Sequence, residues 1–481
     1  MKSSNKKKKH AISKILGIVS LILFITFSAL LLMLDMLPTK YIVIYFIIFV
    51  VLYILFMSFI FIKKIKNKFR ITAVVFLCIF GIVFGVGIKY LSETIGFMDV
   101  INNKLLQKEI YYVMTLENSV IDNIKDLKNK KIGLYNSLNS EHALDELEKK
   151  IRVKHSEYKD VIDMFEELEN GKIIAVLINE STKNLLETDL SDMKISLKEI
   201  DKVYISIEKE DIVKVVDVTK KTFNIYIAGG DAFGSIENVT NTDVNMIITV
   251  NPVKRKILLT SIPRDYYVNL PSFGESAYDK LTHAGYYGIE ESVKSIEKLL
   301  NIDINYYVKV NFSTVVGVID AIDGIDVYSD YEFVTHNNEK TEYYKFYVGN
   351  NNLNGKEALA FARDRQSFID GDIQRGKNQQ KVISAVINKV TSSTAIITNF
   401  SGILDSVSLS LSTNMDTKSI NKFIKMQLND MRSWSIESNN LVGTDLYTIE
   451  TYTFPGTSLY VMQQDEQSVT EAKFKIKEYV R

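Results

Sequence analysis

Near the end of the third quarter of the chain, three arginines, an aspartate and a glutamine stand close together. Arg363 and Arg365 are two positions apart, so an extended connection would point both guanidinium groups to the same side. If the chain is helical from Asp372 onward, then Asp372, Arg375 and Gln379 share one helix face. The segment also holds amides that a structural helix would not need: Gln374, Asn378, Gln379 and Gln380. Because guanidinium groups bind phosphate oxygens bidentately, the segment predicts a concentrated anion-binding site.

Polar side chains also stand at the ends of three expected strands. These strands cover residues 222–228, 244–250 and 256–261. The short turn Asn251–Lys254 makes the second and third strands antiparallel. Asp231 follows the first strand, Asp243 precedes the second and Arg264 follows the third, so an up-down-up order places them at one sheet edge. A contribution to folding stability explains the convergence of two carboxylates and an arginine poorly, because exposed ion pairs contribute little stability.

Each of these residues also has a purely structural alternative. Asp231 could be an ordinary turn residue, and Asp243 could cap or start a strand. Arg264 could pair with the following aspartate at the surface, and Asp372 could be a helix N-cap. A purely structural role is least suited to Arg375, because a cation in the first turn of a helix opposes the helix dipole. An anion docked there would reverse that penalty.

Three uncharged apolar stretches precede these motifs, each close to the ~20 residues that a membrane-spanning helix needs. They are Ile15–Leu34, Tyr41–Ile62 and Ile71–Ile88. Residues 1–14 hold six lysines and residues 63–70 hold five basic side chains, whereas the turn between the first two stretches holds only Lys40. This asymmetry predicts a cytoplasmic N-terminus and an extracellular location for residues 91–481. The alternative for the first stretch, a cleaved signal peptide, fits less well because no small-residue cleavage pattern follows it.

Charge is distributed unevenly along the chain. The whole chain has 58 basic and 58 acidic side chains, but residues 1–90 hold 13 basic ones and a single acid, Asp35. Residue 91 onward therefore carries 45 basic and 57 acidic groups, a balance that argues against nucleic acid as a partner. The only cysteine, Cys78, lies in the third apolar stretch, so the outer part must be held together by apolar burial.

Two further blocks carry no recognisable chemistry. Residues 104–216 alternate strand-like and helix-like segments and resemble one lobe of a solute-binding protein; a spacer or protein-docking role is the alternative. The tail has helix-like segments at Ser419–Leu428 and Ser468–Tyr479, with the strand-like Asp445–Phe454 between them. His283 has no second His or Cys at ligand spacing, which predicts a packed or hydrogen-bonded histidine and no zinc site.

A series of motifs joins these candidates in one order. It comprises Gly230-Asp231, Thr242-Asp243, Ser261-Ile262-Pro263-Arg264-Asp265, Asp279-Lys280-Leu281-Thr282-His283-Ala284, the run from Leu353 to Arg365, and Asp370-Gly371-Asp372 with Arg375 and Gln379. In order and spacing this series resembles the LytR-CpsA-Psr family. The resemblance implies an α/β/α catalytic domain with a central mixed sheet, preceded by three transmembrane helices and a small α/β accessory domain.

With this resemblance, the expected organisation has five parts. They are a basic cytoplasmic tail (1–14), three transmembrane helices (15–90), an extracellular accessory α/β domain (91–220), the catalytic domain (221–393) and a C-terminal extension packed on it (394–481).

The resemblance implies a membrane-anchored phosphotransferase that moves an anionic or capsular glycopolymer from an undecaprenyl-pyrophosphate carrier to peptidoglycan. Asp231 and Asp243 match the family's Mg²⁺-binding (or Mn²⁺-binding) acids, and Asp372 matches a supporting acid. The matching pyrophosphate-binding set is Arg264, Arg363, Arg365, Arg375 and Gln379. One residue departs from the pattern, because many members have an arginine where this chain has Asn241.

The expected reaction begins when a wall hydroxyl attacks the sugar-proximal phosphorus and displaces lipid monophosphate, with Asp231, Asp243 or a bound water accepting the proton. Arginines and a divalent cation would neutralise the charge of the diphosphate. Two alternatives remain: a non-catalytic membrane receptor or regulator that binds lipid-linked polymer, and a hydrolase that cleaves lipid pyrophosphate.

Overall fold

A computed structural model describes most of the chain. The described residues are 2–62, 65–102, 106–137, 139–187, 190, 193–208, 210–230, 241–336, 341–392, 400–407 and 410–480. Below, the accessory region denotes the described residues within 106–208, and the main region denotes those within 210–480.

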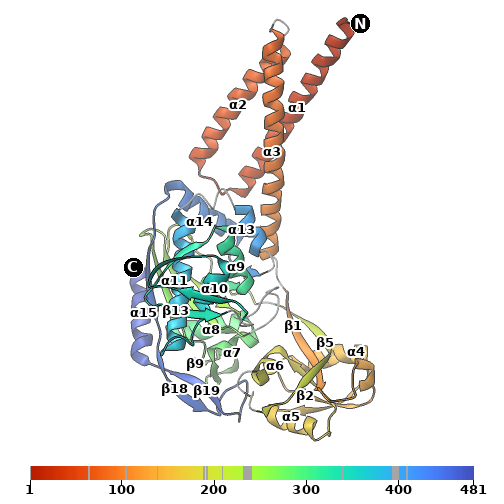
Figure 1. Ribbon diagram of the computed structural model, residues 1–481, viewed down its shortest axis with the longest axis vertical. Coiled ribbons are helices and arrows are strands. Elements are labelled where there is room, and N and C mark those ends of the chain that lie inside the picture. Colours follow the sequence, from red (N-terminus) through yellow and green to blue (C-terminus); the bar gives the residue numbers. More distant parts are fainter. Residues whose placement is uncertain are drawn as a thin grey trace.

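Three long helices form the N-terminal part and project together from the globular body (Figure 1). They are α1 (Lys2–Leu34), α2 (Thr39–Phe61) and α3 (Asn67–Asn102). Each contains a stretch that is long and apolar enough to cross a membrane, which confirms the three expected apolar helices. Aromatic side chains, among them Phe24, Tyr53 and Phe84, fill the space between them.

The end of α3 is packed against the globular body. Phe97 and Met98 on α3 form a buried apolar cluster with Leu404 and Val407 of α13 (Phe400–Val407). The turn between α1 and α2 is also held, because Asp35 pairs with Lys425 at 2.6 Å. The three N-terminal helices therefore have fixed contacts with the main region.

The accessory region is a five-stranded sheet with helices on both faces. Its strands are β1 (Leu106–Leu116), β2 (Lys131–Tyr135), β3 (Lys154–Tyr158), β4 (Ala175–Asn179) and β5 (Leu197–Glu208). Its helices are η1 (Ile124–Leu127), α4 (Ser140–Lys150), α5 (Val161–Glu169) and α6 (Glu180–Glu187). The strand order is β3-β2-β4-β1-β5, in which β2 is parallel to β3 and β4 whereas β1 is antiparallel to β4 and β5.

A six-stranded mixed sheet is the centre of the main region. Its strands are β6 (Phe223–Gly229), β7 (Val244–Asn251), β8 (Lys256–Ile262), β11 (Tyr306–Val310), β16 (Leu411–Thr413) and β17 (Ser435–Asn440). The order is β16-β11-β6-β7-β8-β17. As expected, β6, β7 and β8 run up, down and up as antiparallel neighbours. The parallel pairs β11–β6 and β8–β17 make the sheet mixed, as the family resemblance implied.

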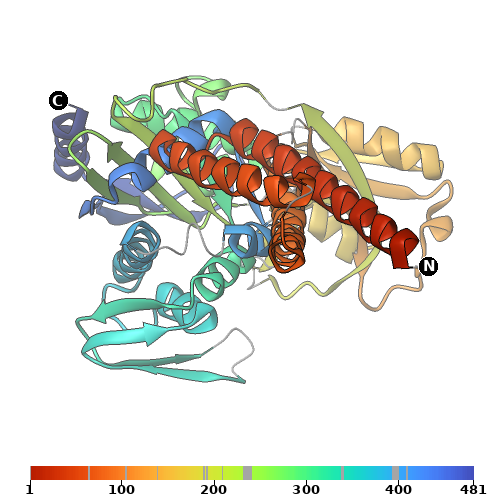
Figure 2. The ribbon, with the colours of Figure 1, turned by 90° about the horizontal axis from the view of Figure 1, so that it is seen from above.

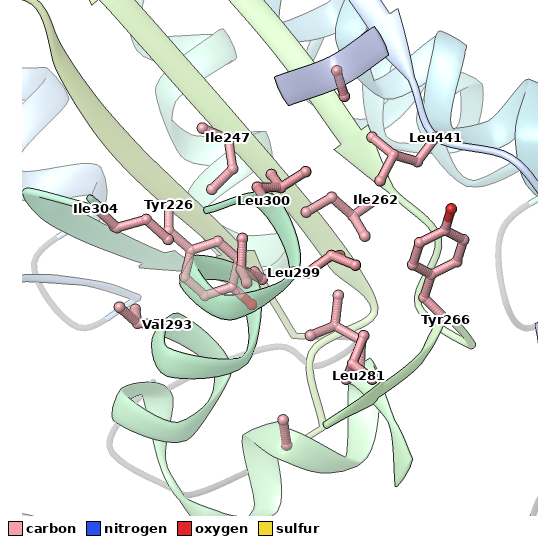
Figure 3. Close-up of a cluster of buried hydrophobic side chains, with 14 of the residues drawn as sticks. Tyr226, Ile247, Ile262, Tyr266, Leu281, Val293, Leu299, Leu300, Ile304 and Leu441 are labelled. Atoms are coloured by element: carbon pink, nitrogen blue, oxygen red, sulfur yellow. The ribbon is translucent and has the colours of Figure 1, made fainter. Parts of the chain in front are cut away.

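Alternate residues along these strands serve two apolar cores. On one face, Tyr226, Ile247 and Ile262 meet α8 (Ile289–Leu300) and α15 (Glu466–Val480), as Figure 3 shows for Val293, Leu299 and Leu300 of α8. On the other face, Phe223, Met246 and Leu259 meet α11 (Gly371–Ser392) and α14 (Thr417–Asp430). Helices on both faces of the sheet give an α/β/α arrangement.

Smaller elements complete the main region. They are β9 (Tyr267–Asn269), η3 (Pro271–Phe273), β10 (Tyr278–Lys280), α7 (Leu281–Ala284), η4 (Gly285–Tyr287), α9 (Phe312–Ala321), β12 (Ile325–Ser329), β13 (Phe333–His336), β14 (Tyr343–Phe346), β15 (Gly349–Leu353), α10 (Gly355–Arg363), β18 (Gly443–Thr448) and β19 (Leu459–Gln464). The pairs β12–β15 and β13–β14 lie beside α10 on one side of the molecule (Figure 2). Phe333, Phe346 and Phe361 pack together there, which anchors α10.

The C-terminal extension (394–481) is not only packed on the catalytic domain but also completes its central sheet, because β16 and β17 are the two edge strands of that sheet. The two expected tail helices fall on α14 and α15. The expected strand Asp445–Phe454 is replaced by β18, which ends at Thr448. The following residues turn toward the accessory region, where Phe454 is buried in its core.

Candidate anion-binding site

Two of the predicted site residues meet at one edge of the central sheet. Asp243 immediately precedes β7, where its backbone N–H donates to the Gly229 carbonyl at the end of β6. Arg264 lies two residues beyond the end of β8. The Asp243 Oδ1 and Arg264 Nη1 atoms are 2.9 Å apart. The antiparallel order of β6, β7 and β8 thus brings them together, as the sequence predicted.

Asp243 and Arg264 belong to a longer chain of charged groups. The Asn241 amide donates to the second oxygen of Asp243 at 3.2 Å. Arg264 also pairs with Asp265, which in turn lies 3.7 Å from the Lys280 ammonium group. Burial alone would lower the pKa of Arg264, but the carboxylates of Asp265 and Asp243 raise it above its ordinary value. The guanidinium group is therefore held as a cation.

Arg363 and Arg365 reach the same place from α10. A capping box of Asn354 and Glu357 starts this helix, and Arg363 is its last residue. The Arg363 guanidinium lies over the Phe312 ring, 4.1 Å from its centroid. The chain is extended at the next residue, Asp364, and leads to Arg365. Both arginines line the cavity described below, although the connection is not extended throughout, as the prediction assumed, because Arg363 still belongs to α10.

Arg375 comes from the first turns of α11. It is largely buried and pairs with Asp372 at 2.6 Å, one turn earlier on the same face. Burial lowers the pKa of Arg375, Asp372 opposes this effect and the neighbouring Arg264 adds to it. Asp372 lies within the first turn of α11, one residue after the helix begins, so it is not the N-cap. Its carboxylate pairs with Arg375. At Gly376 a Cβ would lie 2.9 Å from the Ser261 hydroxyl, so glycine allows α11 to approach β8 closely.

The amides that follow have structural partners, which corrects the expectation that a structural helix would not need them. The Gln374 amide donates to Asn378, and Asn378 donates to the Phe361 carbonyl near the C-terminal end of α10. Gln380 donates to the carbonyls of Leu259 and Asn439, which joins α11 to β8 and β17. Buried amides in these positions satisfy backbone groups and fix the helix that carries Arg375. Of the four amide residues, Gln379 lines the cavity.

These elements enclose a cavity of about 130 Å³. Its walls are formed by Gly229, Gly230, Asp243, Val244, Arg264, Phe312, Arg363, Arg365, Arg375 and Gln379. Four guanidinium groups and one carboxylate thus line the cavity, so its lining is net positive although residues 91–481 are acidic overall. Such a site suits a compact ligand with several negative charges. Asp231 lies outside the described residues.

Comparison with known proteins places the chain in a family. The family model LytR_cpsA_psr matches residues 189–475, which is more than half of the chain. The chain belongs to the LytR-CpsA-Psr family. A second model, described as NMT1/THI5 like, matches residues 100–228, which include the five-stranded sheet of the accessory region.

Several named relatives of this LytR-CpsA-Psr protein are cell-wall transferases. The polyisoprenyl-teichoic acid–peptidoglycan teichoic acid transferase TagT of Bacillus subtilis is 30% identical over 54% of this chain and 78% of its own length. The corresponding TagU transferase of Enterococcus faecalis is 29% identical over 58% of this chain and 87% of its own length. A solved structure of TagT with bound octaprenyl pyrophosphate lipid covers 56% of this chain and 94% of its own, at 25% identity and a TM-score of 0.41.

A metal ion in the site of this LytR-CpsA-Psr protein would need carboxylate ligands. Among the described residues, the cavity presents the single carboxylate of Asp243, and no group of three or more potential metal-binding side chains occurs. One or two carboxylates with phosphate oxygens and water are enough for Mg²⁺. Asp243 therefore fits the expected ion as one ligand, with Asp231 as the predicted second.

A larger cavity of about 560 Å³ adjoins the first one and shares Arg363 and Arg365 with it. It lies between α9, α10 and the β13–β14 hairpin, with an apolar side that includes Val316, Leu359 and Ala360. The sequence did not predict these residues, because their meeting depends on how the hairpin lies against α10. A ligand that binds the arginines can extend into this space.

His283 is a structural residue, as the sequence predicted. Its Nδ1 atom lies 2.6 Å from Asp279 Oδ1 in the buried interior. The second oxygen of Asp279 accepts from the Thr453 backbone N–H at 2.7 Å. Although burial raises the pKa of Asp279, His283 and the Thr453 N–H lower it below its ordinary value. The pair thus ties the Asp279–Ala284 motif to the tail of the chain.

Proposed function

We propose that this protein is a membrane-anchored phosphotransferase that attaches an anionic or capsular glycopolymer from an undecaprenyl-pyrophosphate carrier to peptidoglycan. The observation that carries the proposal is the cavity in which Arg264, Arg363, Arg365 and Arg375 converge beside Asp243. The transferase names of the relatives support the same reaction class.

The arrangement matches what transfer from a diphosphate needs. A diphosphate between lipid and sugar carries negative charge that must be stabilised while a phosphoryl group moves. Guanidinium groups fixed before the substrate arrives do this without reorganisation during the reaction. Here the ion pairs of Arg264 and Arg375 and the ring contact of Arg363 hold three of the four groups in position.

In the proposed reaction, a hydroxyl oxygen of the wall forms a bond to the sugar-proximal phosphorus. The bond between that phosphorus and the bridging oxygen breaks, and lipid monophosphate leaves with the bond electrons. The hydroxyl proton passes to a carboxylate or to a bound water. Both oxygens of Asp243 already accept hydrogen bonds, from Arg264 and Asn241, so we assign Asp243 to positioning and metal binding. This leaves Asp231 or water as the proton acceptor.

Mg²⁺, or Mn²⁺ in its place, is proposed as the cofactor, held by Asp243 and Asp231. When bound, it would supply further positive charge to the phosphate oxygens. Asn241, the expected departure from the family pattern, orients Asp243 in this chain. We infer that the remaining arginines provide the phosphate contacts.

We also propose that the N-terminus is cytoplasmic and that residues 91–481 are extracellular. The lysines of residues 1–14 and the basic side chains of residues 63–70 support this orientation. It would place the site outside the cell, where peptidoglycan is the acceptor. Because α3 packs directly against α13, the main region stays close to the bilayer that carries a lipid-linked substrate.

The test uses the full chain in detergent with lipid-linked polymer, peptidoglycan fragments and Mg²⁺. We expect labelled polymer to become attached to the fragments while lipid monophosphate is released. Release of polymer that is independent of fragments would instead identify a hydrolase. Tight binding of the lipid-linked polymer without turnover would identify a receptor or regulator, and either result would contradict the proposal.

A further inference from the structure

A third cavity, of about 600 Å³, lies between the accessory region and the main region. It shares no lining residue with the arginine-lined cavity. One wall comes from the sheet of the accessory region, and the other from η3, η4 and the segment around Thr453. Its volume is in the range of small-molecule binding sites, about 300–1,000 Å³.

The cavity lies outside the carboxyl ends of the parallel strands of the accessory sheet. β2, β3 and β4 are parallel, and residues that follow each of them line the cavity. The helix after β2, α4, packs on one face of the sheet with Tyr111 and Val113, whereas the helix after β4, α6, packs Leu185 on the opposite face with Tyr112 and Met114. The crevice outside β2 and β4 is thus a topological switch point, which is where open α/β sheets bind ligands.

The wall of the accessory region is polar and held in position. Glu109 is only 5% exposed, and it accepts hydrogen bonds from the Asn139 and Asn179 amides at 2.8 and 3.4 Å. Asn179 is itself fixed, because its oxygen accepts from the backbone N–H and the hydroxyl of Thr182. Burial raises the pKa of Glu109. Burial of a carboxylate lowers the stability of a fold, so a wall with only a structural role would not need Glu109.

The opposite wall is aromatic. Phe273 packs against Tyr287 and Tyr452, with ring centroids 4.6 and 4.8 Å apart. The wall is tied to the accessory region, because the Tyr135 hydroxyl donates to the Thr453 carbonyl at 2.8 Å and Phe454 is buried in the accessory core. The two walls are therefore fixed relative to each other, and the space between them is preformed.

We propose that this cavity, termed the interdomain cavity, binds an uncharged saccharide unit. One face of a sugar ring is apolar and packs on aromatic side chains, while its hydroxyl edge needs both donors and acceptors. The aromatic wall and the amide, hydroxyl and carboxylate groups of the polar wall match these two requirements. No arginine lines the cavity, and its charged lining residues are Glu109 and Lys159, so an anionic phosphate has no match.

The test measures binding to the full chain in detergent by saturation-transfer NMR and calorimetry. The probes are glucose, galactose, N-acetylglucosamine, N-acetylgalactosamine and N,N′-diacetylchitobiose, with uracil as a planar heterocycle of similar size. We expect at least one sugar to bind and to slow amide hydrogen exchange in residues 135–137 and 179–182. Failure of every sugar in the panel, or binding of uracil in their place, would overturn the proposal.

Two exposed positions allow the site to be altered with little risk to folding. Tyr452 is 43% exposed, and Tyr452→Ala should weaken sugar binding roughly tenfold because it removes one aromatic contact. Tyr452→Phe is the matched control and should bind like the wild type. Asn136→Ala changes the polar wall and should also weaken binding. Wild-type affinity in both alanine variants, with unchanged melting temperatures, would show that the sugar binds elsewhere.

Discussion

Replacement of Arg363 tests the arginine-lined cavity most directly. Its guanidinium group faces the cavity from the end of α10 and stacks on Phe312. Removal of one preorganised donor in a site of this kind lowers the rate about 10²- to 10³-fold. Arg363→Ala should therefore reduce polymer transfer by about that factor. Arg363→Lys should recover only part of the loss, because it restores the charge but not the planar fork.

The effect of the same change on folding should be small. The contact with Phe312 at 4.1 Å is worth about 0.5–2 kcal/mol. In a main region of this size, each kcal/mol shifts the melting temperature by about 2–4 °C. The two variants and the wild type should thus melt within several degrees of one another, which distinguishes a lost function from a lost fold.

The assay follows transfer of labelled polymer from lipid carrier to peptidoglycan fragments, with thermal unfolding measured on the same preparations. Arg432→Ala is the matched control, because Arg432 is exposed and is not among the residues lining either arginine-containing cavity. It should behave like the wild type in both measurements. Wild-type turnover in folded Arg363→Ala would refute the role assigned to the cavity.

Three further outcomes are expected. Arg264→Ala should abolish transfer and also destabilise the fold by about 1.5–3 kcal/mol in denaturant titration, because Asp243 and Asp265 lose a charged hydrogen-bond partner that is only 27% exposed. Chelation of divalent cations should stop transfer until Mg²⁺ is added back, and Asp243→Asn should raise the Mg²⁺ concentration needed; full activity in chelator would contradict metal dependence. The lowered pKa of Asp279 means that its stabilisation is present above its ordinary pKa of about 4 and is lost as the pH falls toward its lower folded pKa, so Asp279→Asn should be less stable than the wild type at neutral pH and the difference should shrink in acid. An unchanged difference across that range would show that the Asp279 carboxylate does not contribute in this way.

The part of the fold that sequence predicted best is the part with strong local signals. The three strands from Phe223 to Ile262 are apolar runs separated by turn residues, and their antiparallel order was enough to place Asp243 beside Arg264. The helix face shared by Asp372 and Arg375 followed from the helical period alone.

Elements with weak local signals could not be predicted. β17 is the polar run Ser435–Asn440 and β16 has three residues, so pairing with β8 and β11 decides that they are strands. The role of the amides in α11 was also hidden, because Asn378 and Gln380 donate to backbone carbonyls of elements that are distant in sequence, α10, β8 and β17. The interdomain cavity combines Asn179 with Tyr452, and no local pattern relates positions so far apart.

The way in which the accessory region is joined to the rest of the chain has an evolutionary consequence. Its first and last strands, β1 and β5, are paired neighbours, and Leu106 lies opposite Glu208. Entry and exit are therefore one strand spacing apart, about 5 Å. A module attached in this manner can be exchanged while α3 still leads into the main region, provided that the new module also covers Phe454, so selection can alter the module without changing the arginine-lined cavity.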